Sequence, residues 1–282
     1  MKAFVSIDIE GLPGISSTTM LGPRLSQFQL GSKIMTIIAK ETAEKLLKLG
    51  FERVVVADSH GAMTNINYLE MPEGTTLIQG YPRPYSMLAG LDKETDAAFF
   101  IGYHAAAGTK HGVLDHTMSG RSFAMIKVNG DKASEYLLNA LYAGEYGVPV
   151  ALVAGDEALR EEVEKYTPWA VFVPFKKGYS RYAGGFDSLP EVLARLRKGL
   201  EEAYETVKKN EAKPLILSKP YKVEVIVRDS LIADVAEQLP FITRRDAYTL
   251  EFTVDNGVDL VGIIEVLAMM SYGVSCMRER LN

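Results

Sequence analysis

The sequence predicts an α/β protein in which helices flank a mostly parallel β-sheet. Two observations favour this fold. Short β-branched runs alternate with helical patterns along the first half of the chain. Three of these runs are nearly continuous in apolar residues, as strands are when helices cover both faces of a sheet. The length of 282 residues allows one large or two ordinary domains.

The elements of the predicted sheet follow from local patterns. Four apolar runs read as strands, at 3–7, 53–57, 97–101 and 149–153. Between the first two, apolar residues at helical spacing predict an amphipathic helix over 33–49, which Gly50 ends. A second helix is expected over 132–146, and Asp156 is expected to cap a short helix through residue 165.

The pattern changes after Phe175. A glycine-containing stretch rich in Tyr and Arg precedes a charged helix expected over 189–210. A strand (222–227), a short helix (230–238), a strand (248–254) and an apolar helix (258–272) follow. We therefore expect residues 1–185 to form one α/β domain and residues 186–282 a second, smaller one. A boundary near residues 214–220 is the alternative.

Composition limits the classes of partner. Lys and Arg number 31 against 36 Asp and Glu, and this net charge of −5 argues against a nucleic-acid partner. Asp8 and Glu10 interrupt the first apolar run, which therefore does not resemble a secretory signal. The apolar segment at 260–270 is expected to be too short to span a membrane. A single cysteine, Cys276, fits a reducing compartment, so we expect a cytoplasmic protein without a membrane partner.

Polar residues follow three of the predicted strands. Asp8 and Glu10 follow the first, Asp58-Ser59-His60 the second, and His104 the third. The carboxyl ends of parallel strands meet at one edge, where open α/β sheets bind ligands. Carboxylates together with imidazoles suit Zn²⁺, Mn²⁺, Fe²⁺ or Co²⁺ better than Mg²⁺ or Ca²⁺. A polar pocket without metal is the alternative.

Three further residues are candidates for this site. His111 and His116 lie in a polar loop, and either could supply an acid–base group or be a solvated side chain. Glu135 is expected in the first turn of the second helix, where the helix dipole alone would favour an acidic residue.

With these motifs in this order, the chain resembles the D-aminopeptidase family. The motifs are Ser6-x-Asp8-x-Glu10-Gly11, Asp58-Ser59-His60, Gly102-Tyr103-His104-Ala105, His116-Thr117-Met118, and Asn129-Gly130 leading to Glu135. The match runs along residues 1–156 and continues more weakly to the C-terminus.

The resemblance implies a binuclear zinc peptidase, with two Zn²⁺ per chain, although Mn²⁺ or Co²⁺ could replace zinc. It places Asp8 as the bridge between two ions, Glu10 and His60 on one ion, and His104 and Glu135 on the other. The position matching His116 is the family's catalytic residue, assigned as a nucleophile. An acid–base or oxyanion-stabilising role is physically preferable, because paired metals can themselves generate the attacking hydroxide. The family also forms a ring-stacked homodecamer, so we expect a homo-oligomer. Residues 1–185 would then be the metal-binding catalytic domain, and residues 186–282 would serve oligomerisation and close the pocket.

The resulting expectation is a zinc-dependent aminopeptidase that removes the N-terminal residue from short peptides or aminoacyl amides. Its attacking group would be a metal-activated water, and the resemblance alone implies a preference for D-residues. One rival is another binuclear metallohydrolase, such as an amidase or a phosphoesterase. The other is a non-enzymatic module, either receiver-like with Asp58 as phosphoacceptor or peptide-binding. If the chain is an aminopeptidase, we expect Asp58 instead to hydrogen-bond and orient a histidine that binds the metal.

Overall fold

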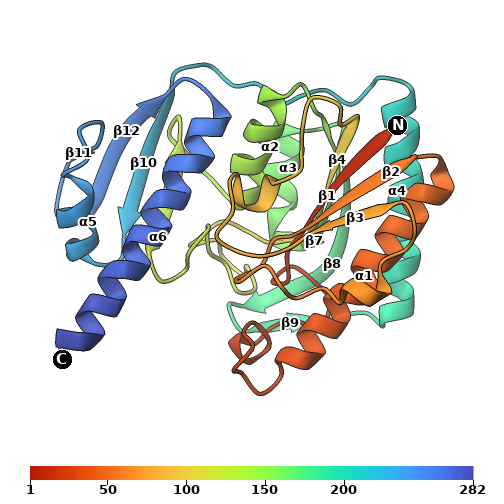
Figure 1. The fold of residues 1–282 in the computed structure, drawn as a ribbon, viewed down its shortest axis with the longest axis horizontal. Coiled ribbons are helices and arrows are strands. Elements are labelled where there is room, and N and C mark those ends of the chain that lie inside the picture. Colours follow the sequence, from red (N-terminus) through yellow and green to blue (C-terminus); the bar gives the residue numbers. More distant parts are fainter. Residues whose placement is uncertain (282) are drawn as a thin grey trace.

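Seven strands form the larger of two sheets, in the order β3-β2-β1-β4-β7-β8-β9 (Figure 1). The structure is a computed structural model and describes residues 1–281. All neighbouring strands in this sheet are parallel except β8 and β9, which confirms the predicted sheet. The four predicted strands are present, whereas β3, β8 and β9 were not predicted. The strands are β1 (Lys2–Ile7), β2 (Arg53–Asp58), β3 (Thr75–Ile78), β4 (Ala97–Tyr103), β7 (Val150–Asp156), β8 (Val171–Ser180) and β9 (Ala183–Gly185).

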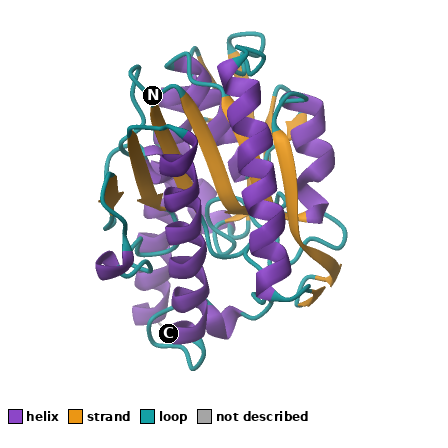
Figure 2. Ribbon diagram, turned by 90° about the vertical axis from the view of Figure 1, so that its right-hand side faces the viewer, coloured by secondary structure: helices purple, strands orange, loops and turns teal. Residues whose placement is uncertain are grey.

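Helices cover both faces of this sheet. On one face lie α1 (Phe28–Leu49) and α4 (Leu189–Lys208), and long helices stand in front of the strands in Figure 2. On the other face lies α2 (Glu135–Glu145), with α3 (Arg160–Tyr166) beside it. Successive strand residues face opposite cores, as in β1, where Phe4 packs on the α2 side and Val5 on the α1 side. This explains the continuous apolar runs in the sequence.

A second, antiparallel sheet has the order β11-β12-β10-β5-β6. Its strands β5 (Phe123–Val128) and β6 (Asp131–Lys132) form a hairpin around Asn129-Gly130, which have φ values of 53° and 90°. These left-handed conformations are the ones that an Asn-Gly hairpin turn requires. Because β6 pairs in this hairpin, the helix expected from residue 132 begins only at Glu135. The remaining elements are β10 (Tyr221–Val227), β11 (Thr243–Arg244), β12 (Thr249–Val254), α5 (Ser230–Ala236) and α6 (Gly257–Leu281).

The chain does not divide between the two sheets at residue 185. Strands β5 and β6 come from the first part of the chain but join the second sheet, and α4 packs on the first sheet with α1. That residues 186–282 act as a separate unit stays a prediction. Four short 3₁₀ helices complete the fold, at Thr18–Met20 (η1), Tyr68–Glu70 (η2), Ser86–Leu88 (η3) and Glu157–Leu159 (η4). Asp156 caps η4 by accepting from the Ala158 amide, and α3 follows directly.

Helix α2 connects the two layers. Its residues from Glu135 through Gly144 are all buried, because β4 packs on one side of it and α6 on another (Figure 1). Ser134 caps its start by accepting a hydrogen bond from the Leu137 amide. The first residue of this helix, Glu135, is therefore held at a fixed place between the two sheets.

Helix α6 is longer than the sequence suggested. Its segment Gly257–Glu279 has 23 residues and a mean hydropathy of 1.8, so by length and composition it is able to cross a membrane. The expectation that this region is too short was therefore wrong. In the fold, one face of α6 buries Leu260, Ile264 and Leu267 in the core that it shares with α2.

Candidate metal centre

The candidate site lies where the strand order reverses, at the carboxyl ends of β1 and β4. Asp8 and Glu10 follow β1, and His104 follows β4. These three side chains are at most 4% exposed. Charged groups this deeply buried require a compensating partner, so the edge predicted from the sequence does gather its polar residues in one place.

Two glycines allow the strands to approach closely at this edge. Gly102 has a φ of 73°, and a Cβ there would collide with the Asp8 carbonyl oxygen. A Cβ at Gly155, on β7, would collide with the Tyr103 carbonyl oxygen. Only glycine fits these positions, and the resulting contacts fix the separation of Asp8 from His104.

Asp8 lies between two histidines. Its Oδ2 is 3.3 Å from Nε2 of His104, and its Oδ1 is 3.4 Å from Nδ1 of His60. On the His60 side, Oε2 of Glu10 is 2.8 Å from the same Nδ1. On the His104 side, Oε2 of Glu135 is 3.6 Å from Nε2. The Asp8 carboxylate therefore lies between two pairs of residues, His60 with Glu10 on one side and His104 with Glu135 on the other.

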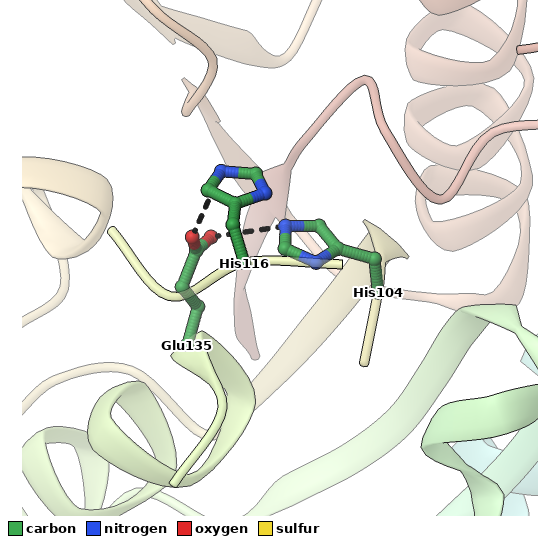
Figure 3. Close-up of side chains that lie close together, drawn as sticks. All are labelled: His104, His116 and Glu135. Atoms are coloured by element: carbon green, nitrogen blue, oxygen red, sulfur yellow. Dashed lines mark ion pairs between the residues drawn. The ribbon is translucent and has the colours of Figure 1, made fainter. Parts of the chain in front are cut away.

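His116 joins the same cluster from the loop before β5. Its Nε2 is 3.5 Å from Oε1 of Glu135 and 4.0 Å from Oε1 of Glu10. Its ring stacks on His104 with centroids 4.3 Å apart and an angle of 13° between the planes. Figure 3 shows both imidazoles turned toward the Glu135 carboxylate.

Backbone carbonyls orient all three imidazoles. His60 Nε2 lies 2.8 Å from the Leu21 carbonyl oxygen, His104 Nδ1 lies 3.1 Å from that of Ala105, and His116 Nδ1 lies 2.9 Å from that of Leu114. A carbonyl only accepts, so in each neutral ring this nitrogen carries the hydrogen. The other nitrogen therefore points its lone pair toward the carboxylates, and this is the tautomer in which a histidine held by a backbone carbonyl can bind a metal.

Several of the carboxylate and imidazole atoms that face one another in this cluster lack hydrogen-bond partners. Among the described residues, Oδ2 of Asp8, Oε2 of Glu10 and Nε2 of His104 are buried atoms with no such partner. Two sets of ligand atoms each lie within 4.8 Å of one another, His104 with His116 and Glu135, and Asp8 with Glu10 and His104. The donor set and its orphaned atoms fit a bound cation.

The electrostatics agree with this interpretation. Burial by itself would raise the pKa of Asp8, but His104 and His60 hold it far below its usual range. Burial would likewise lower the pKa values of His60 and His104, yet the surrounding carboxylates raise both well above the usual value. The carboxylates thus attract positive charge strongly, and a metal ion would satisfy them as those protons do.

Asp58 does not face this cluster. It is fully buried and accepts hydrogen bonds from the Asn65 and Ile66 amides, the Asn65 side chain and Gln79. Among the described residues, Asp58 forms no hydrogen bond or ion pair with a histidine ring, so the expected direct support of a histidine ligand is not seen. Its burial also contradicts a phosphoacceptor role.

Two further residues of the loop that holds His116, namely His111 and Asp115, have partners outside the cluster. His111 is exposed, with Nδ1 2.9 Å from the Tyr179 carbonyl oxygen. Asp115 does not orient His116, because its carboxylate accepts from the Gly108 amide and from Arg181.

Sequence patterns missed one buried cation beneath the site. Lys176, on β8, donates to the carbonyl oxygens of Glu10 and Ile15. Burial lowers its pKa to about 8, although Asp156, Glu10 and Asp8 oppose that shift. A lysine within an apolar strand is the only sequence signal that could have indicated it.

A cavity of about 630 Å³ opens onto the cluster. It is lined by Asp8, Glu10, His60, His116 and Glu135, by residues around η3, and by one face of α6. Cavities of this volume accept small molecules. The sequence predicted that residues 186–282 close the pocket but pointed to no residue of α6, and closure by this part of the chain stays a prediction.

An α/β sheet with buried carboxylates and carbonyl-oriented imidazoles at its switch point defines a metallohydrolase-like centre. The profile of the D-aminopeptidase family matches residues 1–266. This chain therefore belongs to the D-aminopeptidase family of peptidases, as the motifs predicted.

One sequence match and one solved structure show how close this similarity is. A D-aminopeptidase of Bacillus subtilis (strain 168) is 36% identical over 185 residues, which cover 65% of this chain and 66% of that protein. The solved structure of the zinc-dependent D-aminopeptidase DppA from Bacillus subtilis, described as a self-compartmentalizing protease, superposes with a TM-score of 0.91. It is 28% identical, and the match covers 96% of this chain and 98% of that one.

Proposed function

We propose that this chain is a zinc-dependent aminopeptidase that releases the N-terminal residue of short peptides or aminoacyl amides, with a preference for D-residues. One observation carries the proposal: Asp8 lies between the His60–Glu10 pair and the His104–Glu135 pair, with orphaned donor atoms facing inward. This arrangement suits two ions that share one carboxylate. The structural relative is described as zinc-dependent, which supports zinc as the metal.

The protein's own residues would hold and orient the reactants. Asp8 would bridge the ions, Glu10 and His60 would bind one of them, and His104 and Glu135 the other. When bound, two such ions supply an activated water and polarise the scissile carbonyl. The Met118 amide donates to Oε1 of Glu135 at 2.7 Å and so fixes the orientation of that carboxylate.

His116 would act as the acid–base residue. Its Nδ1 is engaged by the Leu114 carbonyl, so Nε2 is the atom that exchanges a proton. That atom lies 3.5 Å from Oε1 of Glu135, and His116 also lines the cavity. Nε2 is therefore close both to a proposed metal ligand and to the space for the substrate. It can take the proton from the attacking water and deliver it to the leaving amine, or stabilise the oxyanion.

We further propose that the chain works as a cytoplasmic homo-oligomer. The description of the structural relative as self-compartmentalizing supports an assembly, and a ring-stacked decamer stays a prediction.

The metal content per chain tests the proposed function. Elemental analysis should find about two zinc ions in the wild-type protein and a marked loss in Asp8→Asn, because a bridging oxygen is removed. Asp229→Asn is the control. It changes an acid outside the cluster, and asparagine can still cap α5 by accepting from the Leu231 amide. A metal-free wild-type protein that stays inactive toward D-aminoacyl amides after zinc or manganese is added would overturn the proposal.

A further inference from the structure

One face of α6 forms a wall of the cavity. The cavity is lined elsewhere by residues of the candidate metal centre, and on this side by Glu265, Ala268, Met269 and Tyr272. Their spacing of three, four and seven residues places them on the same side of the helix. The adjacent face, with Ile264 and Leu267, packs in the core. The orientation of α6 is thereby fixed, and Glu265 is presented to the cavity.

The charged residues that line this cavity are predominantly acidic. Its described lining residues include four acids and no lysine or arginine. Three of the acids, Asp8, Glu10 and Glu135, are the metal ligands proposed above. Glu265 remains as the one lining acid outside that set, so the cavity keeps a negative charge on the α6 side when metal ions neutralise the other side.

Glu265 has polar neighbours but no ion-pair partner among the described residues. Burial raises the pKa of the neighbouring Tyr81, and the nearby Glu265 carboxylate raises it further. Burial lowers the pKa of Arg83, on the same loop as Tyr81, while the nearby charges of Asp58 and Glu265 oppose that shift. Arg83 nevertheless forms no ion pair with Glu265 among the described residues. It donates instead to the carbonyl oxygens of Ile78, Asp58 and Ser86. The carboxylate therefore remains available to a cation that enters the cavity.

We propose that Glu265, assisted by the hydroxyl of Tyr81, binds the N-terminal ammonium group of the substrate. This inference rests on the proposed function, because an aminopeptidase must recognise a free amine. The ammonium would donate to the Glu265 carboxylate and to the Tyr81 oxygen, while the Tyr81 hydroxyl donates to Glu265. Met269 and Tyr272 lie one and two turns further along the same face and offer apolar surface beside that position.

The test compares two inhibitors that differ only in the amine. One is a phosphinic analogue of D-alanyl-D-alanine and the other is its counterpart without the α-amino group. Calorimetry on the zinc-loaded protein measures both dissociation constants without turnover. We expect the wild-type protein to bind the amine-bearing compound about 10-fold to 100-fold more tightly, as for a hydrogen-bonded charge pair.

Glu265→Gln should bring this ratio close to one while the affinity for the compound without the amine stays within about twofold. Tyr81→Phe should reduce the ratio partly. Glu279→Gln, an exposed acid on the same helix, is the matched control and should leave the ratio unchanged. Zinc content should be equal in all four proteins. If the ratio persists in Glu265→Gln, the assignment of Glu265 is wrong and the peptidase proposal stands. If the wild-type protein binds neither compound, the proposed function fails and this assignment with it.

Discussion

Replacement of Glu162 by glutamine should stabilise the protein at alkaline pH but much less at acidic pH. Glu162, on α3, accepts a hydrogen bond of 3.1 Å from the amide of Ser134, the residue that caps α2. Burial raises the pKa of Glu162 from 4.5 to about 7, against the opposing effects of Ser134, Lys132 and Lys165. The folded protein therefore holds a proton that the unfolded chain releases above pH 4.5.

The sign follows from proton linkage. Between the two pKa values the native state binds more protons than the unfolded state, so the free energy of unfolding falls as pH rises. The full shift corresponds to about 3 kcal/mol. Partial exposure of the side chain reduces this to about 1–2 kcal/mol. Glutamine stays neutral and can still accept from Ser134, so it removes this cost.

Urea denaturation of the metal-free protein at pH 5 and pH 8.5 measures the effect. The stability gained by Glu162→Gln should be larger at pH 8.5 by about 1–2 kcal/mol. The exposed neighbour Glu161 provides the control, since Glu161→Gln should change little at either pH. A gain that does not depend on pH, or one matched by Glu161→Gln, would refute the reasoning.

Two further variants test the metal centre. Lys176→Met should lower the thermal midpoint and weaken zinc binding about 10-fold or more, because two buried carbonyls on the Glu10 loop lose their donor. Melting curves measure the thermal midpoint and zinc titration measures the affinity. Lys177→Met, at the exposed neighbour, serves as the control. An unchanged zinc affinity in Lys176→Met would contradict this prediction. His116→Gln should keep the zinc content while kcat on a D-aminoacyl amide falls about 100-fold or more. Full activity with full zinc content would remove His116 from the mechanism.

The sequence allowed most of the site to be predicted, because its residues follow strands. Asp8, Glu10, His60 and His104 lie at or just after strand ends, and parallel strands bring their carboxyl ends to one edge. The structure brings Glu135 and His116 to the same place. Local position alone left both open, His116 against a solvated loop histidine and Glu135 against an acid favoured by the helix dipole, and the family motifs favoured them as site residues. The roles of Glu135 as a metal ligand and of His116 as the catalytic residue stay predictions.

Several strands of the fold could not be predicted from the local sequence. Strand β8 was missed because Pro174, Lys176 and Gly178 interrupt its apolar pattern, although Lys176 is buried there. Strand β5 was missed as well, and its partner β10 lies about 100 residues further along the chain. A pairing between such distant segments leaves no mark in either segment alone.

By itself, the sequence determined the parallel α/β sheet and the edge at which its polar residues gather, because both follow from local periodicity and from the position of residues at strand ends. Only the tertiary structure decided that β5 and β6 join the second sheet and that α2 is buried between the layers. It also decided that α6 turns Glu265 toward the cavity. Local spacing shows which side chains of α6 share a face, but the packing of distant segments sets which face lines the pocket.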